Sequence, residues 1–197
     1  MIDLIIPYYN NPEGLKRTLK SVNKDIFYIT VVDDCSTIPY SLYPEIDQIF
    51  RYNKNRGPGY ARQYGIDHTS NDFIMFIDTG DIFLSKEIQK EIDYIVKENT
   101  SSTMFSFLYC YKGELTKHTD NRMHGKVYNR NFLETYNIHF CDESSYMNED
   151  IGFNRTCRLI INEKHLLSMR IDKPVIYWEE DEESLTQRNE CEAKYKD

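Results

Sequence analysis

One short acidic run of the sequence has the residue types and spacing of a metal or phosphate site. Asp78 and Asp81 flank Thr79-Gly80 and directly follow the apolar segment Phe73 to Ile77. Carboxylate oxygens suit Mg²⁺ and Mn²⁺, and a bound cation neutralises the charge of a leaving diphosphate. Acids after a strand also make turns or cap a helix, and in isolation that interpretation is favoured. The run therefore needs partners from elsewhere in the chain.

Two other segments carry groups that suit a nucleotide. Asp34 follows the apolar run Ile26 to Val32, and its carboxylate can accept a hydrogen bond from a base or ribose. Arg56 and Arg62 lie on either side of Gly57-Pro58-Gly59, and either guanidinium can reach a diphosphate. The alternatives are an Asp-Ser turn for Asp34 and a solvated helix face for each arginine.

The later part of the chain offers candidates for an acceptor and a base. Glu149-Asp150 lies at a predicted helix start, where the helix dipole favours carboxylates and where one of them can deprotonate a hydroxyl. His124, before Gly125, can touch an acceptor, although a lone histidine is more often structural or exposed. Tyr9 can stack on a base or a sugar, but half-buried tyrosines are also common in cores.

Elements that position these groups follow from apolar runs and turn signals. The first half predicts an alternation of strands and helices, which favours a mainly parallel central sheet flanked by helices. In such sheets, ligands bind in the crevice beyond the carboxyl ends of the strands. Three polar segments are predicted to converge there: Pro7-Tyr8-Tyr9-Asn10, Asp33-Asp34 and Asp78-Thr79-Gly80-Asp81. The predicted strands are Ile2 to Pro7, Ile26 to Val32, Gln48 to Tyr52 and Phe73 to Ile77, with helices beginning near Pro12, Tyr60 and Ser85.

The second half of the sequence is less regular. It predicts strands at Thr103 to Tyr111, Val127-Tyr128 and Val175 to Trp178, and helices near Asn131 to Tyr136 and from Asn148 or Glu149. From Glu179 onward the chain is highly charged, which is typical of a surface or a tail.

Composition narrows the class of protein. The 197 residues fit one domain, and the formal net charge of -8 without a Lys/Arg cluster argues against a general nucleic-acid-binding surface. No apolar run approaches the ~20 residues of a membrane span, and the N-terminus does not read as a signal peptide. Five cysteines without a Cys-x-x-Cys pair disfavour disulfides and zinc, so we expect a cytoplasmic protein.

Read in order, these segments resemble the GT-A fold glycosyltransferases of family 2, from about Ile2 to Thr186. The segments that carry the resemblance are Leu4-Ile5-Ile6-Pro7-Tyr8-Tyr9-Asn10, Val31-Val32-Asp33-Asp34-Cys35-Ser36-Thr37, Asn55-Arg56-Gly57 through Ala61-Arg62-Gln63-Tyr64-Gly65-Ile66, Phe76-Ile77-Asp78-Thr79-Gly80-Asp81, His124-Gly125-Lys126-Val127-Tyr128-Asn129-Arg130, Asn148-Glu149-Asp150 and Ser184-Leu185-Thr186.

The resemblance implies a single α/β domain of GT-A (Rossmann-like) type over residues 1–186, followed by a charged tail at 187–197. Residues 1–100 would form the nucleotide-binding half and 101–186 the acceptor-binding half. The implied activity is inverting transfer of a sugar from a nucleotide-sugar, UDP-linked before others, to a hydroxyl acceptor. That acceptor is a glycan, a lipid-linked glycan or a modified nucleobase.

The resemblance also implies roles for matching positions. Asp150, with Glu149 beside it, would supply the catalytic base, His124 and Gly125 would contact the acceptor, and Asp78 and Asp81 would hold the metal. The donor would be bound by Pro7, Tyr9, Asp34, Arg56, Arg62, Asp78, Thr79 and Gly80.

One departure from the family pattern concerns the metal. Gly80 stands where the family usually carries the Asp that contacts Mn²⁺ or Mg²⁺, so Asp81 replaces it, the phosphates bind most of the cation, or metal dependence is weak. Two other functions remain open, a nucleotidyltransferase and a non-catalytic domain. The first would need a glycine- and lysine-rich loop after the first strand, where this chain has Tyr8-Tyr9-Asn10-Asn11-Pro12.

Overall fold

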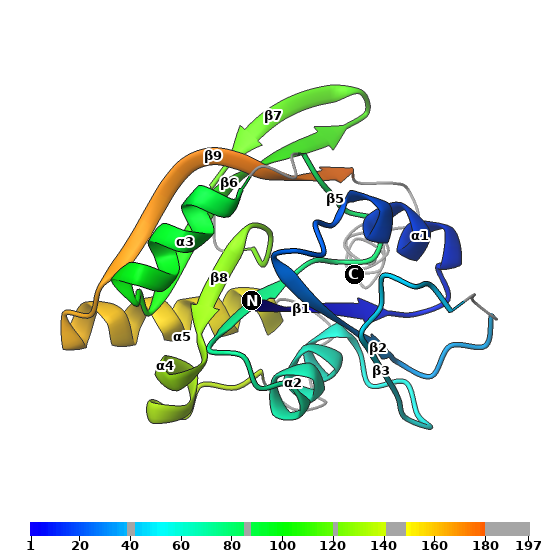
Figure 1. The fold of residues 1–197 in the computed structure, drawn as a ribbon, viewed down its shortest axis with the longest axis horizontal. Coiled ribbons are helices and arrows are strands. Elements are labelled where there is room, and N and C mark those ends of the chain that lie inside the picture. Colours follow the sequence, from blue (N-terminus) through cyan, green and yellow to red (C-terminus); the bar gives the residue numbers. More distant parts are fainter. Residues whose placement is uncertain (39–41, 85–87, 120–121, 141–148, 180–197) are drawn as a thin grey trace, which may run out of the picture.

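A mixed β-sheet with helices on both faces forms the body of the protein (Figure 1). The structure is a computed structural model, and it describes residues 1–38, 42–84, 88–119, 122–140 and 149–179. Its strands are β1 (Ile2–Tyr8), β2 (Phe27–Asp33), β3 (Gln48–Arg51), β4 (Phe73–Phe76), β5 (Ile82–Phe83), β6 (Ser102–Tyr111), β7 (Glu114–His118), β8 (Lys126–Asn129) and β9 (Ser168–Glu179). Its helices are α1 (Pro12–Ser21), α2 (Pro58–His68), α3 (Gln89–Glu98), α4 (Arg130–Thr135) and α5 (Glu149–Lys164).

The first half of the chain builds the parallel part of the sheet. Strands β3, β2, β1 and β4 are neighbours in that order, and all three pairs are parallel. Every residue of β1 is buried, as expected for a central strand covered on both faces. Helix α1 begins where sequence predicts, with the Asn11 side chain accepting from the Gly14 N–H and Pro12 in the first turn.

Side chains of β1 alternate between two hydrophobic cores, one on each face of the sheet. Leu4 and Ile6 belong to the core that contains residues of α1 and α3, whereas Ile5 belongs to the core with residues of α2, α4 and α5. This alternation is the period-two pattern of a strand. Both faces of this part of the sheet are thereby covered. The polar side chains that follow the carboxyl ends of its parallel strands lie outside these two cores.

The second half of the chain makes the sheet mixed. Strand β8 runs antiparallel between β4 and β6, while β6 pairs parallel with β9. Strand β7 forms a hairpin with β6, which projects at the top of Figure 1, and β5 pairs antiparallel with β9. The predicted α/β fold is confirmed. Sequence did not predict β5, β7 or the first part of β9.

Several predictions lie on residues outside the described ranges. They are the helix cap at Ser85, the motif residue Asn148, the turn at Ser184-Leu185-Thr186 and the tail at 187–197, so the domain limit at residue 186 stays a prediction. In the described ranges, every helix is too short or too polar to cross a bilayer.

Candidate functional site

The acidic turn after β4 is attached to the end of β1. The Asp81 N–H donates to the Asp78 carbonyl at 3.0 Å, which closes the turn. The Thr79 hydroxyl donates to the Pro7 carbonyl at 2.6 Å. Thr79 and Pro7, both predicted to bind the donor, therefore hold the ends of β4 and β1 together. This contact places Asp78 and Asp81 at the carboxyl ends of the parallel strands.

Helix α1 fixes the same turn from the other side. The buried Thr18 hydroxyl donates to the Asp81 carbonyl at 2.8 Å and accepts from the Gly80 N–H at 2.9 Å. The Arg17 Nε donates to the Gly80 carbonyl at 2.8 Å. Sequence reasoning missed Thr18, although a polar residue between the apolar positions Leu15 and Leu19 of a helix was a usable signal.

Gly80 has a backbone φ of +109°, a conformation that strains any L side chain. A side chain at this position would strain the turn as it is built here. Asp81 is therefore the second carboxylate that the turn presents.

A buried arginine joins two of the predicted regions of the site. Arg62, on α2, donates to the Asp78 carboxylate at 2.6 Å and to the Glu149 carboxylate at 2.7 Å. Only 3% of Arg62 is exposed. Burial alone would lower the pKa of Arg62, but the two carboxylates outweigh it and raise that pKa. Arg62 thus connects the acidic turn to the first residue of α5.

Asp81 has a different partner. Its carboxylate lies 2.9 Å from Nδ1 of His124, and both side chains are buried. Burial raises the pKa of Asp81 although His124 opposes the effect. Burial also acts to lower the pKa of His124, but the neighbouring Asp81 raises it. The pair therefore lies in a poorly solvated place.

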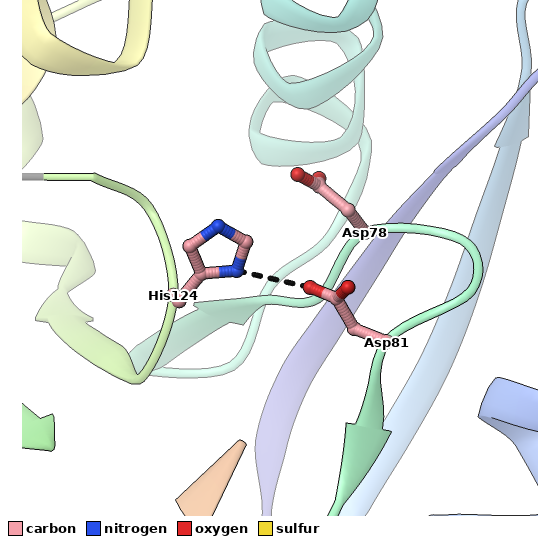
Figure 2. A group of neighbouring side chains, drawn as sticks. All are labelled: Asp78, Asp81 and His124. Carbon is pink, nitrogen blue, oxygen red and sulfur yellow. Dashed lines mark hydrogen bonds and ion pairs between the residues drawn. The ribbon is translucent and has the colours of Figure 1, made fainter. Parts of the chain in front are cut away.

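Asp78, Asp81 and His124 together form a candidate metal site (Figure 2). Each offers one ligand atom, and these atoms lie within 4.8 Å of one another. The donor set of two carboxylates and an imidazole fits a divalent transition metal such as Mn²⁺ better than Mg²⁺, which prefers oxygen. Sequence predicted Asp78 and Asp81 as ligands and assigned His124 to the acceptor instead.

Gly125 holds the His124 segment against β6. Its carbonyl accepts from the Phe105 N–H at 2.7 Å, and a side chain at this position would meet the Phe105 carbonyl at 3.3 Å. In this structure, the glycine predicted to touch an acceptor permits the close approach that brings His124 to Asp81.

The predicted base-binding residues gather at the ends of β1 and β2. Both carboxylate oxygens of Asp34 accept backbone N–H groups, from Arg56 and from Gly57, each at 2.7 Å. Burial raises the pKa of Asp34 despite these two bonds. The Arg56 guanidinium stacks 3.6 Å from the centre of the Tyr60 ring, and Tyr9 is half exposed.

Asp150 lies one residue into α5. Its carboxylate accepts from the Ile151 N–H at 2.7 Å, and its carbonyl accepts from the Asn154 side chain at 2.9 Å. Glu149, in contrast, is committed to Arg62. Among the described residues, no hydrogen bond joins the side chain of Asp150 or Tyr9 to that of Arg62 or His124.

An aromatic side chain that sequence reasoning left without a role lies beside the candidate metal site. Trp178, near the end of β9, stacks on the His124 ring with 4.6 Å between centroids and 17° between planes. The predicted strand Val175 to Trp178 contained the residue, but the contact with His124 depends on tertiary structure.

Comparisons with known proteins give a consistent result. Residues 3–150 match the family model described as Glycosyl transferase family 2. An uncharacterised glycosyltransferase of Rickettsia conorii is 33% identical over 107 residues, which cover 50% of this chain and 18% of that protein. The minor teichoic acid biosynthesis protein GgaA of Bacillus subtilis is 28% identical over 159 residues, or 71% of this chain and 35% of that protein. The chain thus spans well under half of either relative.

Solved structures share the fold. Staphylococcus aureus TarS in complex with UDP has a TM-score of 0.76 at 18% identity, covering 92% of this chain and 61% of that one. The mannosyltransferase PcManGT from Pyrobaculum calidifontis, in complex with GDP-Man and Mn²⁺, has a TM-score of 0.66 at 12% identity, covering 90% of this chain and 56% of that one.

Proposed function

Since the chain belongs to glycosyltransferase family 2, we propose that it transfers a sugar from a nucleoside diphosphate to a hydroxyl acceptor with inversion. The observation that carries this proposal is the position of Arg62, which binds Asp78 on the donor side and Glu149 beside the candidate base. Residues far apart in sequence are thereby held in one site, as a displacement between donor and acceptor requires.

The proposed reaction is a single displacement. The acceptor oxygen attacks the anomeric carbon, the bond from that carbon to the diphosphate oxygen breaks, and the diphosphate leaves with the electron pair. Asp150 takes the proton of the attacking hydroxyl. We assign this role to Asp150 and not to Glu149, because the Glu149 carboxylate is engaged by the Arg62 guanidinium.

The donor site would be formed at the ends of β1 and β2. Asp34, Arg56 and Tyr9 would contact the nucleotide there, and the backbone N–H groups of Arg56 and Gly57 hold the Asp34 carboxylate in place. We propose a UDP-sugar as the donor, because the structurally similar TarS is described in complexes with UDP and with UDP-GlcNAc. The acceptor would be a glycan or a lipid-linked glycan.

A divalent cation would be held by Asp78, Asp81 and His124. When bound, it supplies charge stabilisation to the leaving diphosphate. We propose Mn²⁺ before Mg²⁺ because of the imidazole in the donor set, in agreement with the Mn²⁺ complex of PcManGT. Arg62 would keep Asp78 ionised and oriented whether or not the cation is present.

A thermal-shift screen tests the donor assignment. Purified protein is heated with a panel of nucleoside diphosphates and nucleotide-sugars, with and without Mn²⁺, because a ligand that binds the folded state raises the melting temperature. We expect UDP and one UDP-sugar to give the largest rise, and Mn²⁺ to increase it. A panel that leaves the melting temperature unchanged would contradict the proposal.

Replacing Asp150 by Asn tests the base. Sugar transfer or donor hydrolysis should fall by about 10²- to 10⁴-fold while UDP still raises the melting temperature. Asp93→Asn, an exposed carboxylate on α3, is the matched control and should keep full turnover. If Glu149→Gln causes the larger loss with UDP binding and stability intact, Glu149 and not Asp150 is the base.

A further inference from the structure

Strand β7 has one edge that no strand of the described residues covers. The strand pairs with β6 along its other edge, and the two form a hairpin that projects from the body of the protein (Figure 1). Glu114, Leu115, Thr116 and Lys117 are exposed, and His118 is half-buried. The free edge of a sheet offers a row of backbone N–H and C=O groups to another strand. The free edge of β7 is therefore a candidate interaction surface.

The turn of the hairpin determines which backbone groups of β7 point outward. Lys112 and Gly113 have positive φ values of 49° and 82°, as the two loop residues of a type I′ turn do. In such a hairpin the pair next to the loop is hydrogen-bonded, so Glu114 bonds to β6, and bonded pairs alternate from there along the strand. The N–H and C=O groups of Leu115 and Lys117 therefore point away from β6, toward the free edge.

The lysine in this strand does not guard the edge. A lysine in an edge strand usually prevents pairing with another chain, because its charge extends beyond the edge. The Lys117 ammonium instead lies 2.9 Å from Oδ1 and 3.0 Å from Oδ2 of Asp172. Asp172 belongs to β9, which pairs with β6 on the side opposite to β7. The Lys117 side chain thus lies back across β6 and does not cover the free edge.

The charges of β7 are distributed unequally along the strand. Glu114 is its first residue, whereas Lys117 and His118 are its last two. An antiparallel copy of the strand would place the acidic end of each strand against the basic end of the other, because a two-fold axis repeats every contact. A parallel copy would bring like ends together. The strand is therefore complementary to itself in the antiparallel direction.

We propose that two copies of this chain associate through β7, which pairs antiparallel with its copy about a two-fold axis at Thr116. Leu115 would lie opposite Lys117 of the partner subunit, and both residues have backbone groups that point toward the free edge. Glu114 would lie opposite His118 of the partner subunit. All five residues of each β7 would be paired, and the two hairpins would form one continuous sheet.

The neighbouring registers fit less well. Directly opposed residues of an antiparallel pair share a face of the sheet, so the two-fold axis moves by whole residues along the strand. An axis at Lys117 would oppose two ammonium groups. An axis at Leu115 would leave Lys117 and His118 without partners in the other β7. The axis at Thr116 is the one that pairs the whole strand and joins opposite charges.

The interface would be small. An interface of this size is expected to form reversibly, so the fraction of dimer depends on protein concentration. The inference goes beyond the proposed function and does not depend on it, because the residues assigned to the candidate site lie outside β7. Loss of one would leave the other in place.

Sedimentation velocity of the full chain over about 1 to 300 μM tests the proposal, because small interfaces dissociate in that range. We expect a change from monomer to dimer as the concentration rises. Leu115→Lys should weaken association by about three- to thirtyfold, because the new ammonium faces Lys117 of the partner subunit at two equivalent places. Leu159→Lys, which changes a leucine of similar exposure on α5, is the matched control and should associate as the wild type does.

A mixing experiment tests the register. Glu114→Lys and His118→Glu should each associate about three- to thirtyfold more weakly than the wild type, because one opposes two basic groups and the other two acidic groups. Mixed in equal amounts, the two variants should form a heterodimer nearly as readily as the wild type forms its dimer, since the new lysine of one faces the new glutamate of the other. A folding defect in either variant would not be repaired by mixing.

Three results would overturn the inference. A full chain that stays monomeric at every concentration would do so, and the edge would then belong to a segment of the same chain or of another protein. Equal association of Leu115→Lys and Leu159→Lys would place the contact elsewhere on the molecule. A mixture that associates no better than its separate variants would remove the proposed pairing of Glu114 with His118.

Discussion

Asp78 and Asp81 belong to one short turn, yet their surroundings differ in kind. Asp78 pairs with Arg62, a permanent cation, and its pKa is lowered because Arg62 outweighs the effect of burial. Asp81 is buried beside His124, and burial raises its pKa. One carboxylate is held by a guanidinium, whereas the other is held by an imidazole.

The difference suggests separate duties for the two carboxylates. The Arg62 group, formed by Arg62, Asp78 and Glu149, holds α2, the acidic turn and α5 together and gives the site its shape. The His124 group, formed by Asp81, His124 and Trp178, joins the turn to strand β9. Stability is expected to depend on the first group, and metal binding on the second.

The largest expected effect comes from breaking the Arg62 group. Arg62→Met should lower the free energy of unfolding by about 3 kcal/mol, because it leaves two carboxylates without their cation. The value lies at the low end for a buried pair since Asp78 keeps some contact with water. Urea denaturation measures the change.

A triple variant sharpens this test. Adding Asp78→Asn and Glu149→Gln to Arg62→Met removes the uncompensated charges and should restore part of the lost stability. Lys164→Met, which breaks an exposed ion pair with Glu163 on α5, is the control and should leave the denaturation midpoint unchanged. An Arg62→Met protein as stable as wild type would remove the structural role of the group.

A smaller effect is expected when Asp81 or Asp78 is replaced and the affinity for Mn²⁺ is measured. Asp81→Asn should weaken Mn²⁺ binding by at least about tenfold. Asp78→Asn should weaken it less, because one Asp78 oxygen already bonds to Arg62. Titration of Mn²⁺ in the presence of UDP, followed by melting temperature or by the spin-resonance signal of free Mn²⁺, measures both, with Asp93→Asn as control. Equal losses would mean that the two environments do not separate the roles.

The smallest effect concerns Thr18, which holds the turn between the two groups. Thr18→Val should lower the free energy of unfolding by about 1 kcal/mol, because the Gly80 N–H loses its acceptor but remains within reach of water. Thr18→Ser keeps the hydroxyl and should retain most of the stability. Faster amide exchange at Gly80 in Thr18→Val alone would confirm the contact, and equal exchange in both variants would contradict it.

Much of the site could be predicted from the sequence, because its polar residues directly follow the apolar runs that form the strands. Apolar runs predicted β1, β2 and β4. Polar residues directly after those runs were therefore expected together at the carboxyl ends of the parallel strands. The family resemblance followed from the order of these segments and is confirmed. Period-two and helical patterns are local, so they can be read without knowing the fold.

Tertiary structure alone decided which charges meet. Nothing in the spacing of Arg62, Asp78 and Glu149 shows that one guanidinium binds both carboxylates, or that His124 reaches Asp81. Such contacts depend on how α2, α5 and the segment before β8 pack, which is set by the two cores as a whole. The sequence by itself determined which side chains lie at the carboxyl ends of the parallel strands, because each directly follows a strand. The packing of distant elements decided that Asp78 pairs with Arg62 and Asp81 with His124.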